Sequence, residues 1–494
     1  MPRTKLLSLI LLTCFVHNSA QAELQNCPDL EPPRHGGMAS GQAGAAIMGP
    51  LKTVMAPKRK VPFPKGSIDS VRISLDRTEC YGSCPSYTIE LMGDGSASYE
   101  GRSFVLVAGH HSYDVPKDDV ECLLTHFRKA SFWSLADKYV ADITDGPTYT
   151  ISLTIGGQTK TIVDYFGRAV GMPATITALE EEIDRIGGVD RWVKATDDTI
   201  PSLQKEGFDF HSQAAATMLA NSVYEAPDDF IFALMEAGAP VTGRARPLRV
   251  TAVEAASRAG RLAIVQALIA RGAFLNGPPD VKEAALRGAT YSGNPRVVAE
   301  ILKYNPDVNA QALLIEIERY SSNKPDSDIV AVVRLLLDAK ADVNIADVFG
   351  NTALFGLDNA EVVNLLIRAG ADVNHANRNG QTALFRASNA KVVNLLIRAG
   401  ADVNRANKNG ETALFWVSNE EVVNLLIGAG GQVNIADENG MTPLLSAQSD
   451  EAAVALIQAG ADTGVKAKSG LTIQKYATER KFVETLQLLR KLPR

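Results

Sequence analysis

Two cysteines separated by three residues have the most specific chemistry in this sequence. Cys80 and Cys84 flank a turn at Gly82, and a disulfide between them would fix the crossing from one strand to the next. Either cysteine could instead pair with Cys27 or Cys122, because four cysteines allow three connectivities. A redox-active pair is less favoured, since oxidoreductases of that kind place two residues between their cysteines. We therefore predict a disulfide between Cys80 and Cys84.

The same two cysteines would suit zinc if two imidazoles joined them, because two thiolates and two imidazoles form a common tetrahedral ligand set. His110 and His111 are the candidate imidazoles. Adjacent side chains on a strand point to opposite faces, so only one of these histidines could easily reach a metal. We therefore assign no metal ligand and no cofactor, and we keep a metal-binding or enzymatic domain as the alternative interpretation.

Other catalytic signatures are missing from the sequence. There is no Gly-x-Ser-x-Gly elbow, no His-Glu-x-x-His and no phosphate-binding loop. Asp142, Asp145 and Asp164 lie near expected turns or strand ends, where aspartates usually accept hydrogen bonds from backbone amides. We expect that structural role and assign no catalytic residue.

The cysteines lie in a region, residues 67–195, in which apolar and polar residues alternate with period 2. One β-hairpin is expected to turn at residues 93–95 and another at 156–157, because glycine tolerates the positive φ of tight turns. Helices are expected over residues 116–130 and 173–186. We predict an α+β domain, with a mostly antiparallel sheet and two helices.

One stretch of this domain resembles a family of small bacterial envelope domains of unknown function. The resemblance covers roughly 125 residues and includes Phe132-Trp133 and Asp164-Tyr165. It rests mainly on a Cys-aromatic-Gly-x-Cys-Pro run and the strand residues after it, namely Cys80, Tyr81, Gly82, Cys84, Pro85, Tyr87, Gly93, Asp94, Gly95, Tyr99 and Gly101. It implies a shared fold, and it brings no activity to transfer.

The last third of the chain repeats itself every 30 residues. The short sequences TALF, VVNLLI and AGADVN recur between regularly spaced glycines, which are Gly350, Gly380, Gly410, Gly440 and Gly470. This unit resembles the ankyrin repeat, which implies an all-α solenoid of stacked helix pairs. Less regular units precede the regular ones, and we predict about eight or nine repeats over residues 210–494.

The regular units are shorter than the usual ankyrin repeat of about 33 residues. In an earlier unit Val265 follows Thr251 by 14 residues, whereas in a regular unit Val363 follows Thr352 by 11. We expect the three missing residues to fall between two helices that both persist. Trp416 follows Phe415 at a position that commonly packs, so we expect it in the core.

Partner binding in ankyrin arrays uses the tips of the projecting hairpins and the adjoining concave face. The resemblance places these positions at Val348, Asn351, Arg378, Gln381, Lys408, Glu411, Glu438 and Met441. Arg368 and Arg398 recur in one column, which would suit an acidic partner. A solvated charged face is an equally good interpretation of the arginines.

The N-terminus has the pattern of an export signal. Residues 1–22 combine Arg3 and Lys5, an apolar run too short to span a bilayer, and an Ala-Gln-Ala cleavage site. We expect cleavage there, a periplasmic or secreted location, and a flexible linker rich in Pro, Gly and Ala over residues 23–66. The four cysteines that remain agree with an oxidising compartment.

The 494-residue chain is long enough for several folded units, and its net charge of −6 gives no reason to expect nucleic acid as a partner. No other stretch approaches the roughly 18 apolar residues that a membrane-spanning helix needs. We therefore predict an exported protein that binds another protein through its solenoid. An enzymatic or metal-binding N-terminal domain, or a toxin-neutralising immunity protein, are the alternatives. The oligomeric state and the partner's identity do not follow from the sequence.

Overall fold

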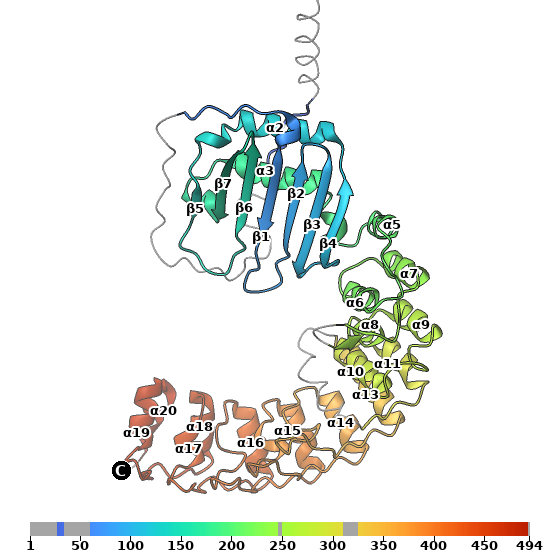
Figure 1. Ribbon diagram of the computed structural model, residues 1–494. Coiled ribbons are helices and arrows are strands. Elements are labelled where there is room, and N and C mark those ends of the chain that lie inside the picture. The colour runs from blue at the N-terminus through green and yellow to red at the C-terminus, as the bar shows by residue number, and fades with distance from the viewer. Residues whose placement is uncertain (1–26, 34–59, 246–248, 310–324, 493–494) are drawn as a thin grey trace, which may run out of the picture. The chain divides into compact units, whose positions relative to one another are not determined.

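The protein is described here by a computed structural model. It describes residues 27–33, 60–245, 249–309 and 325–492. The expected signal peptide, residues 1–22, and most of the expected linker, residues 23–66, lie outside these ranges. The chain divides into two compact units, residues 1–240 and 241–494, each described by itself below (Figure 1).

The first unit is built on one seven-stranded sheet with the strand order β4-β3-β2-β1-β6-β7-β5. The strands are β1 (Arg72–Arg77), β2 (Ser86–Met92), β3 (Ser96–Ser103), β4 (Gly109–Asp114), β5 (Lys138–Val140), β6 (Tyr149–Ile155) and β7 (Gln158–Tyr165). Both expected hairpins are present, β2–β3 and β6–β7. The short edge strand β5 pairs with β7 in parallel, so the sheet is mixed and not purely antiparallel.

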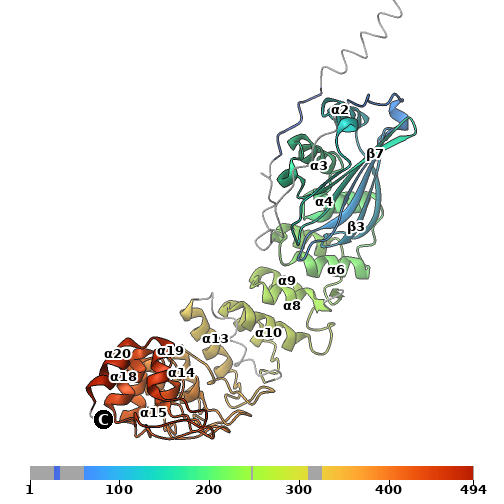
Figure 2. The same cartoon turned by 90° about the vertical axis from the view of Figure 1, so that its left-hand side faces the viewer.

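Helices α2 (Lys117–Lys129) and α3 (Ala174–Ile186) cover one face of this sheet (Figures 1 and 2). The alternation along the strands places Ile73, Ile89 and Ile151 on the covered face, where they are fully buried. Further short helices in this unit are η1 (Ile68–Ser70), η2 (Phe132–Ser134), η3 (Gly167–Val170), α4 (Asp190–Val193), α5 (Thr199–Lys205), α6 (Gln213–Ser222) and α7 (Asp228–Glu236). The predicted α+β architecture is confirmed.

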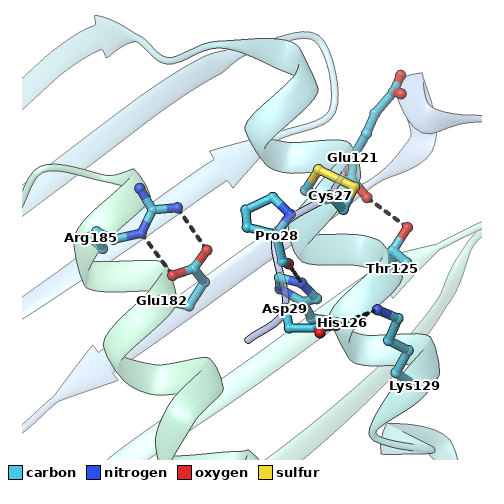
Figure 3. The surroundings of a disulfide bond; sticks show 10 residues. Cys27, Pro28, Asp29, Glu121, Thr125, His126, Lys129, Glu182 and Arg185 are labelled. Carbon is cyan, nitrogen blue, oxygen red and sulfur yellow. Dashed lines mark hydrogen bonds and ion pairs between the residues drawn. A yellow bond between two sulfur atoms is a disulfide. The ribbon is translucent and has the colours of Figure 1, made fainter. Parts of the chain in front are cut away.

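A segment within the expected linker is held against the helical face. Cys27 forms a disulfide with Cys122 of α2. The His126 Nε2 atom lies 2.9 Å from the carbonyl oxygen of Pro28, which accepts the hydrogen bond (Figure 3). Residues 27–33 therefore pack on α2 as part of the folded unit.

Residues 60–66, at the other end of the expected linker, also contact the folded unit. The backbone N–H of Val61 donates to Ser134 Oγ at 2.8 Å. The ring of Phe63 lies edge-on to that of Trp133, with 5.3 Å between ring centroids. The described parts of this stretch are thus held to the folded unit at Cys27 and Pro28 and at Val61 and Phe63.

The second unit is a stack of helices with one small two-stranded sheet, β8 (Arg244–Ala245) and β9 (Val250–Thr251). Its first helices alternate as pairs, α8 (Ala252–Arg258) with α9 (Leu262–Ala270) and α10 (Val281–Ser292) with α11 (Pro295–Leu302). The helices that follow are α13 (Asp326–Asp338), α14 (Ala360–Arg368), α15 (Ala390–Arg398), α16 (Glu420–Gly428), α17 (Pro443–Ser446), α18 (Asp450–Gln458), α19 (Ile473–Arg480) and α20 (Val483–Lys491).

The regular units keep one full helix each, which corrects the expectation that both helices persist. Where an earlier unit has the seven-residue helix α8, residues 353–356 form a single turn. Residues 383–385 form the 3₁₀ turn η4 at the equivalent place. Losing three residues removes almost one turn from a helix that had two, so the first helix cannot propagate. The missing residues therefore come from the first helix itself.

The remaining helix of each unit is defined at both ends by its sequence. Asn359, Asn389 and Asn419 accept hydrogen bonds from backbone N–H groups of the first turn. Gly370 follows α14 with φ of 93°, a left-handed conformation that glycine adopts without strain. Leu366 and Leu396 are buried at equivalent positions, so each unit covers the next. No helix within the described ranges is long and apolar enough to cross a membrane.

Candidate functional site

A cleft of about 640 Å³ opens in the first unit, beside α3 and the strand ends. Its walls include Arg77 at the end of β1, Tyr87 at the start of β2 and Tyr149 at the start of β6. In the sheet order β2-β1-β6 these three residues lie on neighbouring strands, and register pairs Arg77 with both tyrosines. A cavity of this size fits a small ligand.

Part of the cleft wall consists of the Arg77 guanidinium packed against the phenol rings of Tyr87 and Tyr149. The Arg77 guanidinium lies 5.1 Å from the centre of the Tyr149 ring and 6.0 Å from that of Tyr87. The Tyr87 hydroxyl donates to Asp184 Oδ2 at 2.8 Å. Burial raises the pKa of Tyr149 to about 12, so both phenols stay protonated at neutral pH. Arg77 is thus held by ring faces that favour a cation.

Two carboxyl groups meet deeper in the cleft. Asp164 ends β7 and Glu180 lies on α3, and their carboxyl groups share a hydrogen bond. Burial, and then the charge of Asp164, raise the pKa of Glu180 well above its usual range. Burial also raises the pKa of Asp164, which accepts the backbone N–H of Gly167 at 2.6 Å. One proton held between the two groups satisfies both observations.

Asp184 lies one helical turn beyond Glu180, on the same face of α3. Burial raises the pKa of Asp184 to about 7, while its hydrogen bond from Tyr87 opposes the rise. Glu180 is only 4% exposed, and its Oε1 atom has no hydrogen-bond partner among the described residues. The same is true of Asp184 Oδ1.

The cleft was not predicted from the sequence. Asp164 was assigned a backbone-binding role, and the structure shows that role together with a carboxyl partner. One signal was readable: Glu180 follows Ile176 by four residues and precedes Ile183 by three, which places a carboxylate on the buried stripe of α3. Nothing local to Arg77 indicates that two strand neighbours would enclose it.

The cysteines border this cleft without forming a metal centre. Cys80 bonds to Cys84, and Pro85 just beyond that loop lines the cleft. His110 is exposed on β4, whereas His111 is buried, with its Nδ1 atom 2.7 Å from Glu206 Oε2. In the part of the chain that the structure describes, no group of three His, Cys, Asp or Glu side chains is arranged to hold a metal.

The second candidate site is formed by the hairpins that project from the regular units. Asp347 Oδ1 accepts the backbone N–H groups of Phe349 and Asn351 at 2.8 and 2.9 Å. Gly350, with φ of 81°, completes the turn by donating to the Asp347 carbonyl. The same turn recurs at Asn377, Asn407 and Asp437. An acceptor side chain three residues before glycine therefore builds each hairpin.

Consecutive hairpins are hydrogen-bonded to one another at their tips. The backbone N–H of Arg378 donates to the Phe349 carbonyl at 2.9 Å, and that of Lys408 donates to the Asn379 carbonyl at 3.0 Å. These bonds align one exposed side chain from each hairpin in what we call the tip row. The tip row consists of Val348, Arg378, Lys408, Glu438 and Lys468.

A second ladder joins each unit to the next through asparagine side chains. Asn404 Nδ2 donates to the carbonyl of Gly430 at 2.9 Å, and Asn404 Oδ1 accepts the N–H of Gln432 at 2.8 Å. Asn344, Asn374 and Asn434 make the equivalent pairs of bonds. The last residue of each AGADVN stretch thus connects its unit to the end of the following helix.

Comparison with protein-family models agrees with this geometry. Residues 324–407, 352–432 and 387–467 match the model described as Ankyrin repeats (3 copies). The regular units are ankyrin repeats. Residues 71–187 match the model described as Domain of unknown function (DUF6438), so that resemblance is also confirmed. No curated protein matches the sequence.

The ankyrin array separates the eight expected partner-binding residues into two sets. Val348, Arg378, Lys408 and Glu438 are exposed in the tip row, with Val348 70% exposed. The other four, Asn351, Gln381, Glu411 and Met441, are half-buried. They follow the tips by three residues, and their backbone N–H groups close the hairpin turns. Only the first set has side chains fully available to a partner.

Trp416 corrects another expectation, since it is 57% exposed and not in the core. Its backbone has φ of 62°, and its Nε1 atom donates to Glu411 Oε1 at 3.2 Å. The chain leaves the single inner turn at this point, so the residue after buried Phe415 faces outward. The shortened first helix of the ankyrin unit is the physical reason.

Proposed function

We propose that the protein is exported and that its ankyrin array binds a protein partner through the tip row. The tip row supports this proposal most directly, because its side chains are exposed while its backbone is fixed by hydrogen bonds between units. A rigid surface loses little conformational freedom on binding, and this favours affinity. Ankyrin repeats indicate a protein partner.

The charge of the tip row favours a partner with an acidic surface. Arg378, Lys408 and Lys468 outnumber Glu438, whereas the chain as a whole has a net charge of −6. Exposed Arg368 and Arg398 add positive charge at the ends of α14 and α15. We infer a partner with an acidic surface, whose association weakens as salt rises.

Export is supported by the N-terminal pattern of residues 1–22 and by two disulfides in the first unit. The test is cell fractionation of the natural host with sequencing of the mature N-terminus. Export predicts a chain that begins at Glu23 in the periplasm or medium. An intact Met1 in the cytosol would overturn this part of the proposal.

Binding is tested by affinity capture from an envelope extract with the mature chain as bait. Arg378→Glu/Lys408→Glu reverses two charges in the tip row. Arg296→Glu/Lys391→Glu makes the same charge change at exposed positions outside it. We expect the first variant to lose the captured protein and the second to keep it. Equal capture by both variants would exclude the tip row as the binding surface.

A further inference from the structure

The cleft of the first unit contains buried hydrogen-bond acceptors that the chain itself leaves unfilled. Glu180 Oε1, Asp184 Oδ1 and Thr177 Oγ1 have no partner within the described residues, and all three residues line the cleft, as does Arg77, whose Nε atom also has none. A buried polar atom without a partner destabilises the folded state, because it has lost its hydrogen bonds to water. Such groups are rare in folded proteins and are expected where a ligand or ion completes them.

We propose that this cleft binds the primary ammonium group of an amine ligand. The three unfilled acceptors sit on one face of α3, at Thr177, Glu180 and Asp184, with spacings of three and four residues. A primary ammonium supplies three donors and one compact positive charge, which matches in number three unpartnered oxygens on one face of the helix. This binding site lies in the first unit and is independent of partner binding by the ankyrin array.

The charges around the cleft favour a cation over an anion. Acidic residues lining it outnumber basic ones, seven to four: Glu31, Asp164, Glu180, Glu181, Glu182, Asp184 and Asp190 against Arg77, Arg168, Arg185 and Lys194. Two of the basic residues are engaged locally, since Arg185 pairs with Glu182 at 2.7 Å and Lys194 with Asp190 at 3.2 Å. Arg77 is held by the rings of Tyr87 and Tyr149.

The carboxyl pair determines how many protons are released when the ammonium binds. Burial raises the pKa of both Asp164 and Glu180, which share a hydrogen bond, and the proposal takes the free pair to hold one proton between them. When R–NH₃⁺ enters, it donates to Glu180, the shared proton leaves to solvent, and both carboxylates are ionised. One cation replaces another, so the site keeps its net charge. Binding therefore strengthens as pH rises towards the range in which the free pair ionises.

The charged and titratable groups that face this pair come from every element around it. They are Arg77 on β1, Tyr87 on β2, Tyr149 on β6, Arg168 on η3, and Glu181 and Asp184 on α3. The side chains of Leu30 and Phe166 add apolar surface to the walls. This composition suits an alkyl chain that carries the ammonium, because the chain can pack on carbon while the head group meets the oxygens.

The experiment is titration calorimetry of the mature chain with small probes. Pentylamine supplies the ammonium, 1-pentanol is its neutral counterpart, and tetramethylammonium is a cation without N–H donors. We expect pentylamine to bind at least about tenfold more tightly than either, as removal of a charge-assisted hydrogen bond implies. Titration in phosphate and in HEPES, which has no primary amine and a different ionisation enthalpy, measures the released proton. Equal binding of pentanol, or no amine binding up to 10 mM, would overturn the proposal.

Substitutions in the cleft test whether pentylamine binds there. Glu180→Gln keeps a neutral side chain of the same shape and should weaken pentylamine at least about tenfold and abolish proton release. Asp184→Asn is the second variant, in case the first fails to fold. Glu100→Gln, at an exposed position on the opposite face of the sheet, is the control and should bind as the wild type does. Unchanged affinity in folded Glu180→Gln would refute the assignment of this site.

A final pair of probes distinguishes the natural source of the ammonium. Nα-acetyl-lysine amide represents a lysine side chain of a polypeptide, and 1,5-diaminopentane represents a free small amine. Tighter binding of the first assigns the cleft to lysine in a peptide, and tighter binding of the second assigns it to a metabolite-sized amine. Both results require the ammonium site, whereas failure of both at 10 mM contradicts it.

Discussion

The first unit and the ankyrin array use their polar side chains in opposite ways. In the array, Asn404 and Asp347 direct their oxygens and nitrogens to backbone groups, so they fix the architecture. In the cleft, Glu180 and Asp184 each keep one buried oxygen unfilled. The array also has two buried oxygens without a partner, Thr412 Oγ1 and Thr442 Oγ1, but among the described residues only the cleft has unpartnered carboxylate oxygens. The two proposals follow this difference, with a protein partner for the array and a small ligand for the first unit.

The largest change in unfolding free energy is expected from removing disulfides of the first unit, and the two disulfides should differ in their contribution. Cys27 and Cys122 are 95 residues apart, whereas Cys80 and Cys84 are four apart. On a loop-closure model, Cys27→Ser/Cys122→Ser should cost about 4–5 kcal/mol of unfolding free energy and Cys80→Ser/Cys84→Ser about 2 kcal/mol. Urea unfolding in a Trp416→Phe background would measure this, because the remaining tryptophans, Trp133 and Trp192, lie in the first unit. Equal losses would contradict the ranking.

Apolar burial should dominate the stability of the array. Leu396 on α15 is 1% exposed, and Leu396→Ala should cost about 2–5 kcal/mol through lost contacts and a cavity. Ile397→Ala, at the next and only half-buried position, should cost clearly less. Unfolding followed by helical circular dichroism measures both. If the two variants were equally unstable, the inward stripe of α15 would be wrongly assigned.

Ionisation of Asp184 should make the first unit less stable at higher pH. The folded state holds this proton more tightly than the unfolded chain, because burial raises the pKa of Asp184 to about 7. Its stabilising contribution is complete below the unfolded pKa and is lost as pH rises towards 7, by at most about 1.4 kcal/mol per pH unit. Asp184→Asn should weaken the pH dependence of the unfolding free energy, measured by urea unfolding between pH 5 and 7.5. Glu100→Gln should leave that pH dependence unchanged. An unaltered slope in Asp184→Asn would reject this account.

The asparagine ladder should give the smallest effect that can still be measured. Asn404→Ala removes two hydrogen bonds between ankyrin units and should cost about 1–2 kcal/mol. Asn424→Ala, at an exposed position on α16, should change stability by less than about 0.5 kcal/mol. Denaturant midpoints of the two variants provide the comparison. Should Asn404→Ala behave like its control, the ladder would be incidental to stability.

The sequence predicts best those features that depend on local periodicity. The turns at Gly93-Asp94-Gly95 and Gly156-Gly157, the two helices on the sheet and the 30-residue unit all follow from patterns within one element. The parallel pairing of β5 with β7 could not be predicted in this way, because the three residues Lys138–Val140 are too few to show an alternating pattern. The outward position of Trp416 also required the knowledge that the inner helix shrinks to one turn.

The cleft was less predictable because its members are distant in the chain. Arg77, Tyr87 and Tyr149 meet only through the pairing of β1 with β2 and β6. Asp164 and Glu180 meet only when α3 packs on the sheet. Residue types at single positions indicate a role, such as an aspartate at a turn, but they do not reveal a shared proton between elements.

The hydrogen bonds between hairpin tips have a consequence for how this chain can change over generations. The backbone bonds between adjacent tips join residues 29 apart, and they recur every 30 residues along the chain. Duplication or deletion of a whole unit therefore restores the same junctions without compensating substitutions elsewhere. Such copy-number changes would lengthen or shorten the row and add or remove one tip side chain at a time. The proposed binding surface can thus be changed by recombination between near-identical segments.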